Sequence, residues 1–373
     1  MDLTFTNEQD ALRDAVSDLL MSTHPLERVS ELADSTQGWD PSTWEQLAQM
    51  GLLGLSVPES LGGSGAGLVE EVVLFEQAGA SLLPGPLFST VALALPALLA
   101  SPLAPETVPA VVSGERRASF AWIEDGQTPY LARAAMSALP AELDESTGTA
   151  VLRGSKTWVT DAASVDWLVV ACRTASGAGL FLVETADASV SLDRVEGIDG
   201  TRRLFRVAFD GAEGRSLVAP AQSRPVFAAI WRRGLLLAAA EAVGIGSRLV
   251  GLSADYARTR QQFGRPIGTY QAVSHAIADM YMNVELARSL CLWGALEAEA
   301  GSRTVDLAVA AAASVALPGA VTAAERALQV HGGLGMTWES PIHRFLKRSL
   351  QMAVLDAPPE LQRHQIARVL LDS

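Results

Sequence analysis

The order of the sequence patterns limits the fold of this chain more than any single motif does. Up to about residue 110, apolar residues recur at helical spacing. From Ala118 to Phe209 the pattern becomes short β-rich runs separated by turn signals, and from about Gln222 long helical patterns continue to the end. Blocks of this kind are typical of an α+β chain rather than of alternating βαβ units. We therefore expect an N-terminal helical domain at 1–115, a middle β-domain at 116–220 and a C-terminal helical bundle at 221–373.

Charge and cysteine content exclude several classes of protein. The chain has 373 residues and a formal net charge of -14, and no run of Lys and Arg offers a surface for nucleic acid. Its two cysteines, Cys172 and Cys291, lie in apolar sequence without a nearby His or Cys partner. This pattern indicates a reducing cytoplasm and predicts no metal site.

Hydropathy predicts no membrane span. The N-terminus lacks the basic start and the apolar core of a secretory signal. Three stretches are strongly apolar, at 89–100, 234–246 and 307–324. The first two are too short to span a membrane, and the second also carries Glu241, whereas the third consists mostly of alanine. We expect all three to be buried helices of a soluble, cytoplasmic protein.

The segment 260–280 predicts two helices joined by a cationic corner. Gly and Pro residues separate two long helical patterns there. Arg258, Arg260 and Arg265 surround Phe263, so the corner could hold an anion with a planar ring beside it. A solvated turn between helices is the alternative.

Trp158 and Thr160 stand two residues apart in a β-rich stretch. On an extended strand both side chains face the same way, so they could stack on a flat cofactor and hydrogen-bond its edge. Ordinary packing within a sheet is the alternative.

The segment 327–337 ends a helix in a glycine turn. Gly332 and Gly333 allow the backbone to approach another group closely, and Gln329 and His331 offer donors beside it. A Schellman-type helix end uses the same glycines, so the local pattern leaves both interpretations open. No carboxylate stands at helical spacing to orient His331 as a base.

Taken together, these stretches are similar to the acyl-CoA dehydrogenase family, and to its bacterial FadE-like members. The similarity covers essentially the whole chain. It rests on the segments 57–67, 156–161, 260–266, and 329–335 followed by 339–344. The last two are specific in combination.

The resemblance implies an acyl-CoA dehydrogenase-like fold with an N-terminal helical domain, a middle β-domain and a C-terminal four-helix bundle. It also implies FAD bound between subunits of a homo- or hetero-oligomer, typically a dimer of dimers. The residues that it places in the cofactor site are Trp158 and Thr160 at the isoalloxazine ring, and Arg260, Phe263, Gln329 and Gly333 at the ADP part and pyrophosphate of a neighbour's FAD.

The chain departs from the family at two places. Where the family has a Thr-Glu-Pro-x-x-Gly-Ser-Asp-like loop, the segment 121–129 keeps Glu124 but is shorter and loses the Gly-Ser pair. Near the C-terminus, 355–360 replaces a Tyr-Glu-Gly-Thr-x-Gln motif, which puts Asp356 at the position of the family's commonest catalytic Glu. Asp356 has the right chemistry for a base but is one methylene short.

Glu241 is the alternative base. Some family members carry the base on the first bundle helix, at the position of Gly234, two turns before Glu241. The apolar helix around Glu241 offers no cation, so this carboxylate must meet a cation from elsewhere, face water or titrate upward. A structural ion pair with another bundle helix is the use that we expect.

The resemblance implies a reaction as well as a fold. We expect FAD-dependent α,β-dehydrogenation of an acyl-CoA thioester to the trans-2-enoyl-CoA. A carboxylate removes the α-proton, flavin N5 accepts the β-hydride, and an electron-transfer flavoprotein takes the electrons. The altered motifs are similar to those of bacterial members that act as unequal partners in heterotetramers, often on bulky groups such as sterol side chains. A non-catalytic partner subunit that completes another chain's FAD site is therefore the alternative, and a flavin oxygenase of the same fold is a second one.

Overall fold

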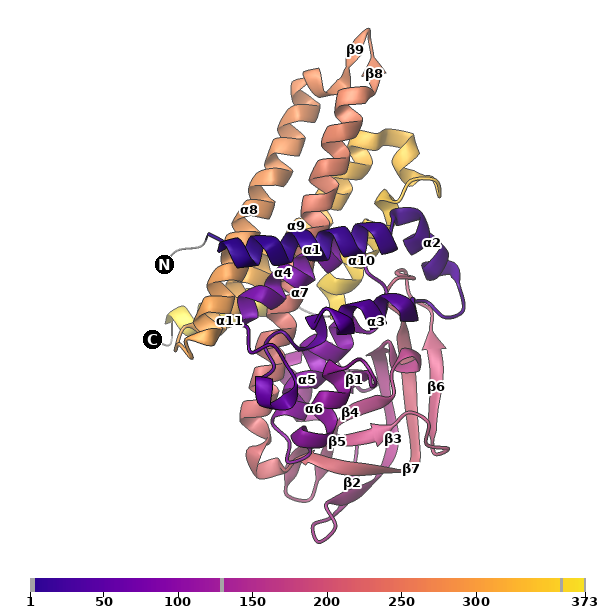
Figure 1. The fold of residues 1–373 in the computed structure, drawn as a ribbon, viewed down its shortest axis with the longest axis vertical. Coiled ribbons are helices and arrows are strands. Elements are labelled where there is room, and N and C mark those ends of the chain that lie inside the picture. Colours follow the sequence, from indigo (N-terminus) through magenta and orange to yellow (C-terminus); the bar gives the residue numbers. More distant parts are fainter. Residues whose placement is uncertain (1–3, 128–130, 356–357, 372–373) are drawn as a thin grey trace. The chain divides into compact units, whose positions relative to one another are not determined.

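The computed structural model describes residues 4–127, 131–355 and 358–371 (Figure 1). Its elements confirm an α+β chain in which helices, strands and helices follow one another. The N-terminal helices are α1 (Asn7–Thr23), α2 (Leu26–Asp34), α3 (Pro41–Gln49), α4 (Leu68–Ala80), the π-helix η3 (Phe88–Ala94), α5 (Leu95–Leu99) and α6 (Ala104–Val112). Asp40 is the N-cap of α3, because its Oδ1 accepts a hydrogen bond from Ser42 N at 2.9 Å.

The strands and the C-terminal helices follow in order. The strands are β1 (Ala118–Ala121), β2 (Ala141–Asp144), β3 (Thr149–Thr160), β4 (Trp167–Thr174), β5 (Gly177–Glu184), β6 (Val190–Val195), β7 (Leu204–Val218), β8 (Gln261–Gln262) and β9 (Arg265–Pro266). The helices are α7 (Pro220–Thr259), α8 (Gln271–Glu299), α9 (Val305–His331), α10 (Ile342–Leu355) and α11 (Pro359–Leu371). The sequence patterns missed β2 and β6, which are short and mostly exposed on one face.

Contacts divide the chain into two compact units, and each is described by itself. The bundle unit comprises 1–31, 67–83 and 235–373, and the sheet unit comprises 32–66 and 84–234. The N-terminal helices are therefore shared between the two units. The division into three domains at 115 and 220 stays a prediction.

The sheet unit is built on a seven-stranded sheet. The strand order is β1-β4-β5-β7-β3-β2, and β6 pairs with β7. β1 and β4 run parallel, whereas the other pairs are antiparallel. Alternation explains the core, since Ala150 and Leu152 on β3 are buried while Val151 and Arg153 between and after them are exposed.

The bundle unit packs helices closely by means of small residues. Along α9, buried alanines recur every four residues from Ala308 to Ala320, so one face of the helix offers almost no side-chain bulk. Figure 1 shows α8 and the end of α7 running side by side up to the β8–β9 hairpin. This confirms the predicted helix–turn–helix corner, because α7 ends at Thr259 and α8 begins at Gln271.

In the part of the chain that the structure describes, two helices are long and apolar enough to cross a membrane by length and composition. They are α7 and the stretch 305–336 that contains α9, and 72% and 56% of their apolar windows are buried in the protein. Burial of this kind is typical of the core helices of a soluble protein. The apolar stretches of the sequence at 234–246 and 307–324 thus form buried helices, as predicted.

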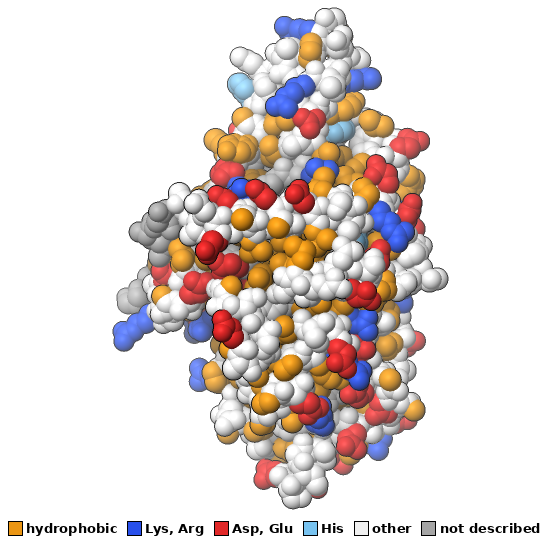
Figure 2. Space-filling model, in the orientation of Figure 1, with side chains coloured by type: hydrophobic (Ala, Val, Ile, Leu, Met, Phe, Trp, Pro, Cys, Tyr) orange, Lys and Arg blue, Asp and Glu red, His pale blue; other side chains and the backbone are white. Residues whose placement is uncertain are grey.

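Acidic residues outnumber basic ones in the chain, with 42 Asp and Glu against 28 Lys and Arg. Figure 2 shows Asp and Glu side chains spread over the face that it draws, with Lys and Arg among them rather than in one continuous basic surface. Lys and Arg also stand at the β8–β9 end, where the sequence predicted a cationic corner.

Candidate functional site

The end of β3 carries Trp158 and Thr160, and both side chains are half-buried. Trp158 has a φ of 51°, in the left-handed region that a bulky residue rarely adopts. Asp161, which follows the strand directly, has a φ of 56°. Such conformations persist where the surrounding structure enforces them, and they are common at functional sites.

A β-bulge accounts for the position of Trp158. Lys156 pairs with Val207 on β7, but Val159 pairs with Phe205, so three steps on β3 match two steps on β7. The one extra residue shifts the alternation of the strand. Val159 consequently joins the sheet core, and the half-buried Trp158 and Thr160 stand on either side of it.

An ion pair between the buried Lys156 and the half-buried Glu124 lies directly beside this bulge. Lys156 is 0% exposed, and its Nζ lies 2.6 Å from Glu124 Oε1, 2.8 Å from Ser137 Oγ and 3.4 Å from the carbonyl oxygen of Trp122. Glu124 also accepts hydrogen bonds from the backbone N–H groups of Ala138 and Leu139. All the donors of the ammonium group and most acceptor positions of the carboxylate are therefore used.

Burial and charge act in opposite directions on this pair. Burial raises the pKa of Glu124, but the hydrogen bond and the charge of Lys156, with further hydrogen bonds, outweigh it and hold that pKa below its ordinary value. Burial lowers the pKa of Lys156, and its bond to Glu124 offsets this only in part. The nearby Cys172 thiol is inert, because burial raises its pKa to about 12.

The cationic corner of the bundle unit leaves one guanidinium without a partner among the described residues. Arg258 pairs with Asp255 at 2.9 Å, and Arg265 lies over the ring of Tyr270 at 4.2 Å. The exposed Arg260, by contrast, has no side-chain partner in the part of the chain that the structure describes. Arg260 is thus the cation of the corner that is available to an anion.

Phe263 stands at the same corner. It is 92% exposed and has a φ of 53°, so it combines an exposed apolar ring with a strained backbone. Its only ring contact among described residues is the edge of Tyr270, at 6.4 Å between centroids. Neither the burial nor the local conformation favours Phe at this position in an isolated chain, so Phe263 is a candidate contact for a ligand or another chain.

The glycine turn at the end of α9 lies at the same end of the bundle. The ring of His331, the last residue of α9, stacks on Tyr256 near the end of α7 with 4.4 Å between centroids. Gly332 caps the helix with a φ of 59°, and Gln329 and Gly333 are exposed. An atom placed at the Cβ position of Gly333 would meet nothing within 4 Å, so open space surrounds this backbone.

The structure thus brings four of the predicted cofactor residues to one end of the bundle unit, where all are exposed. These are Arg260, Phe263, Gln329 and Gly333. An unpartnered guanidinium, an exposed ring and an open glycine backbone fit the phosphates and the planar base of a dinucleotide. Trp158 and Thr160 belong to the sheet unit, where a half-buried indole beside a hydroxyl fits a flat ring.

The two candidate bases have different outcomes. Asp356 lies outside the described residues, directly after the last residue of α10. Glu241 is 3% exposed in its side chain and pairs with Arg348 on α10, which is 2% exposed. The predicted use of Glu241, an ion pair with another bundle helix, is confirmed. Among the described residues, no group of three or more His, Cys, Asp or Glu side chains could hold a metal ion.

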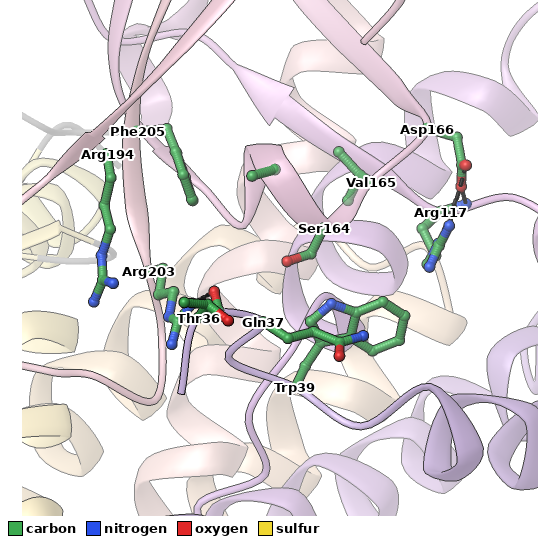
Figure 3. Close-up of a pocket in the computed structure, with 11 residues that line it drawn as sticks. Thr36, Gln37, Trp39, Arg117, Ser164, Val165, Asp166, Arg194, Arg203 and Phe205 are labelled. Atoms are coloured by element: carbon green, nitrogen blue, oxygen red, sulfur yellow. Dashed lines mark hydrogen bonds and ion pairs between the residues drawn. The ribbon is translucent and has the colours of Figure 1, made fainter. Parts of the chain in front are cut away.

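A surface pocket of the sheet unit was not predicted. Three guanidinium groups line this cavity of about 460 Å³, those of Arg117, Arg194 and Arg203 (Figure 3). Arg203 has a structural role, because its guanidinium donates hydrogen bonds to backbone carbonyl oxygens of the segment 32–36. Burial, followed by the like charge of Arg194, lowers the pKa of Arg203.

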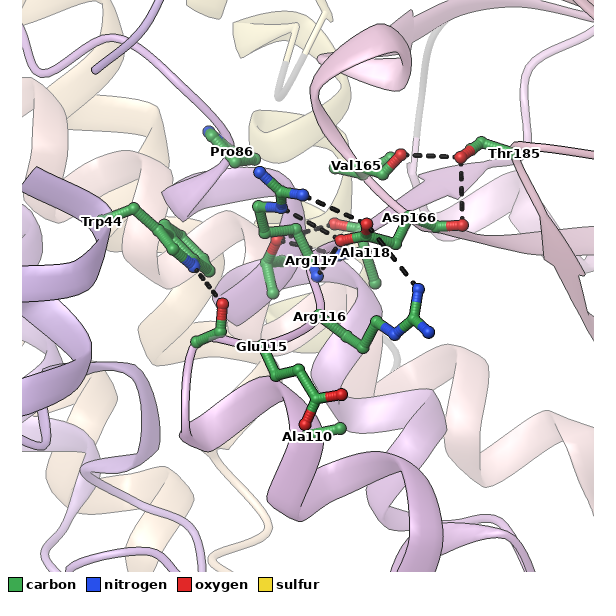
Figure 4. Close-up of polar contacts among 12 residues, drawn as sticks. Trp44, Pro86, Ala110, Glu115, Arg116, Arg117, Ala118, Val165, Asp166 and Thr185 are labelled. Atoms are coloured by element: carbon green, nitrogen blue, oxygen red, sulfur yellow. Dashed lines mark hydrogen bonds and ion pairs between the residues drawn. The ribbon is translucent and has the colours of Figure 1, made fainter. Parts of the chain in front are cut away.

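Arg117 is also committed to the fold. Its Nε and Nη2 donate to the two carboxylate oxygens of Asp166 at 3.0 and 3.1 Å, as Figure 4 shows, and its guanidinium lies 5.0 Å from the ring of Trp39. Only the exposed Arg194 brings to this pocket a charge without a partner among described residues. Arginines that stabilise the fold therefore line most of the charged wall of this pocket. They lie far apart in the sequence, so the sequence alone could not predict the pocket.

Sequence reasoning also missed the pairing of Glu124 with Lys156. Both residues stand in segments that the family resemblance singled out, but 32 positions separate them. Only the fold places their side chains together. No local pattern marked the pair, because β3 also carries Arg153 and several hydroxyl residues.

Two family models match parts of this chain. Residues 6–101 match the model of the acyl-CoA dehydrogenase N-terminal domain, and residues 232–371 match that of the C-terminal domain. The acyl-CoA dehydrogenase FadE27 of Mycobacterium tuberculosis is 30% identical over 377 residues, which cover 97% of each chain.

Two solved structures are similar over nearly the whole chain. The ChsE4-ChsE5 complex from Mycobacterium tuberculosis has a TM-score of 0.88 and 29% identity and covers 100% of both chains. The steroid ACAD Tcur3481-Tcur3483 has a TM-score of 0.87 and 28% identity and covers 98% of both chains.

Proposed function

Since this chain belongs to the acyl-CoA dehydrogenase family of FAD-binding flavoprotein oxidoreductases, we propose that it oxidises an acyl-CoA thioester to the trans-2-enoyl-CoA. The observation that carries the proposal is Phe263, which is 92% exposed and left-handed at the corner that the family uses for a neighbour's FAD. An exposed apolar ring on a strained backbone can pack against a planar group, and the adenine end of FAD is one that fits it.

Asp356 is the base that we propose for the α-proton. Glu241 is a poor candidate, because Arg348 pairs with it in the protein interior, where it is not presented to a substrate. A carboxylate at 356 takes a proton only if backbone placement makes up for a side chain shorter than Glu by roughly 1.5 Å. When bound, FAD supplies the acceptor for the β-hydride.

The residues of this chain have distinct tasks in that reaction. We propose that Trp158 packs on the isoalloxazine ring, that the Thr160 hydroxyl orients its edge, and that Arg260 pairs with a phosphate of a neighbour's FAD. The backbone at Gln329 and Gly333 lies along the pyrophosphate. The supporting features are the half-buried Trp158 and Thr160, and the exposure of the remaining residues at one end of the bundle.

A partner subunit in a hetero-oligomer is the second function that an observation favours. The ChsE4-ChsE5 complex and Tcur3481-Tcur3483 each carry two chain names, and the latter is a steroid ACAD. In this alternative the chain completes the FAD site of a partner, within a dimer of dimers that acts on a bulky acyl group such as a sterol side chain. We propose the cytoplasm as the location and an electron-transfer flavoprotein as the electron acceptor.

Purification of the chain alone and with a co-expressed family member separates these functions. A yellow protein whose flavin absorbance is bleached by acyl-CoA, but not after Asp356→Asn, supports the dehydrogenase. A colourless protein that gains flavin only with the second chain, and bleaching that survives Asp356→Asn, support the partner subunit. Flavin reduction by NAD(P)H without acyl-CoA contradicts both and indicates the oxygenase.

A further inference from the structure

An ion pair between the buried Lys156 and the half-buried Glu124 lies beside the strand segment that carries Trp158 and Thr160. The geometry points to a positioning role: the pair holds the bulge of β3 in register and so fixes the direction of Trp158 and Thr160 toward the flavin. The inference rests on the flavin contacts proposed above. Neither side chain needs to touch the cofactor for this role.

The bulge decides which side chains leave the core. Without it, strict alternation from the buried Lys156 would bury Trp158 and Thr160 and expose Val159. Instead Val159 is 1% exposed and belongs to the sheet core, while Trp158 and Thr160 are half-buried. A shift of one residue in register would therefore remove both proposed flavin contacts at once.

The bulge does not stabilise itself. Trp158 adopts a left-handed φ of 51°, which is unfavourable for a bulky side chain, and the register with β7 is interrupted between Lys156 and Val159. One replacement for the lost ladder bonds is the hydrogen bond from Thr157 N to the carbonyl oxygen of Ile123, at 2.8 Å. The segment 122–124 thus takes over as a pairing partner of the bulge.

Lys156 fastens that segment. Its Nζ bonds to the Glu124 carboxylate and reaches the Trp122 carbonyl oxygen, so it contacts the residues on both sides of Ile123. Glu124 is in turn held by the N–H groups of Ala138 and Leu139. The chain of bonds therefore runs from a fixed backbone turn, through the ion pair, to the strand that bulges.

Charge is not required here for stability alone. A buried ion pair loses hydration on folding, and an apolar pair of similar volume often stabilises a core equally well. What an apolar pair lacks is direction, since dispersion contacts tolerate a slide along the strand whereas three hydrogen bonds from one ammonium group do not. This difference between stability and direction makes the role testable.

The double variant Glu124→Gln/Lys156→Met removes both charges and leaves no unpaired ion. The protein is labelled with 5-fluorotryptophan and studied by ¹⁹F NMR without flavin, and Trp158→Phe assigns the Trp158 signal among the 8 tryptophans. Val183→Ala is the matched control, because it opens a cavity in the same core at a residue that is 0% exposed. FAD affinity is then measured for each variant by titration of flavin fluorescence, in the assembled oligomer.

The expected result is a Trp158 signal that shifts or broadens in the double variant but not in Val183→Ala, with FAD affinity at least tenfold weaker only in the double variant. An unchanged Trp158 signal in a folded double variant overturns the inference. A displaced Trp158 signal with unchanged FAD affinity supports the role of the ion pair in the bulge and contradicts the proposed contact between Trp158 and the flavin. Failure of the inference and failure of the proposed flavin contact are therefore distinguishable. Equal effects in Val183→Ala would overturn the inference too, since they reduce it to general destabilisation.

Discussion

The carboxylate of Glu241 on α7 accepts a hydrogen bond from the guanidinium of Arg348 on α10, and the two side chains are 3% and 2% exposed. Arg348 also donates to the carbonyl oxygen of Leu83 at 3.3 Å, so one guanidinium joins three segments of the bundle unit. A carboxylate committed in this way stabilises the bundle and is not poised to accept a proton from a substrate.

Breaking this pair from one side destabilises the protein more than removing it altogether. Arg348→Met takes the guanidinium from a buried carboxylate, and the free energy of unfolding should fall by about 3–5 kcal/mol. Glu241→Leu/Arg348→Met removes both charges and should recover at least about 2 kcal/mol of that loss. Urea denaturation of the three proteins measures the difference. A double variant no more stable than Arg348→Met would contradict the prediction.

Gly244 lets α7 approach α4 closely. A Cβ atom at Gly244 would overlap the backbone carbonyl of Glu76, and one at Gly79 would overlap that of Glu241. Gly244→Ala should therefore lower the free energy of unfolding by about 1–3 kcal/mol, because backbone cannot move aside as a side chain does. Gly251→Ala, on the same helix with no atom within 4 Å, is the control and should raise it by up to about 1 kcal/mol. Thermal melting of both variants tests this, and loss of stability in Gly251→Ala would argue against it.

The Glu124 carboxylate makes stability depend on pH in the acid range. Its pKa in the folded protein lies below the ordinary 4.5, so its contribution is present above pH 4.5 and is lost as pH falls through the folded pKa. The stability difference between the native protein and Glu124→Gln should therefore shrink steadily below pH 4.5. The lowered pKa of Lys156 affects stability in the alkaline range and does not change the pH dependence of stability below pH 4.5. Urea midpoints of both proteins, measured between pH 7 and the lowest pH at which the native protein still folds, test this prediction. A stability difference that stays constant over this range would contradict it.

Arg260 should contribute to FAD affinity far more than its neighbour Arg258. A charge-assisted hydrogen bond contributes about 1.5–3 kcal/mol, so Arg260→Gln should weaken FAD binding roughly 10- to 100-fold. Arg258→Gln is the matched control, since Arg258 is 77% exposed and pairs with Asp255 in its own helix. Equilibrium dialysis of FAD against the assembled protein compares them, and equal effects would remove Arg260 from the proposed site.

Phe263 should be dispensable for folding but not for the cofactor. Phe263→Gly relieves a left-handed backbone, and the flavin-free protein should be as stable as the native one or up to about 1–2 kcal/mol more stable. FAD affinity should fall in the same variant, because the exposed ring is lost. Chemical denaturation and FAD titration give the two values separately. A large loss of stability without flavin would mean that the ring packs within the chain itself.

The amino-acid sequence by itself determined the succession of a helical, a β-rich and a second helical block, the N-cap at Asp40 and the corner between α7 and α8. Each depends on residues close together in the chain: spacing, a capping side chain, or Gly and Pro in a turn. Motifs of the same short range were enough to indicate the family, and they predict FAD contacts for four residues that lie at the bundle end.

Only the tertiary structure decided which groups meet across the chain. Glu241 pairs with Arg348, which is 107 positions away in the sequence, and Lys156 pairs with Glu124, which is 32 positions away. No local pattern distinguishes these partners from other charged residues. The bulge at Trp158 was equally invisible, because alternation within β3 depends on its register with β7 and on the segment 122–124. Burial makes these contacts specific, since a charge or a strained backbone in the interior is stable only with the partner that the fold brings to it.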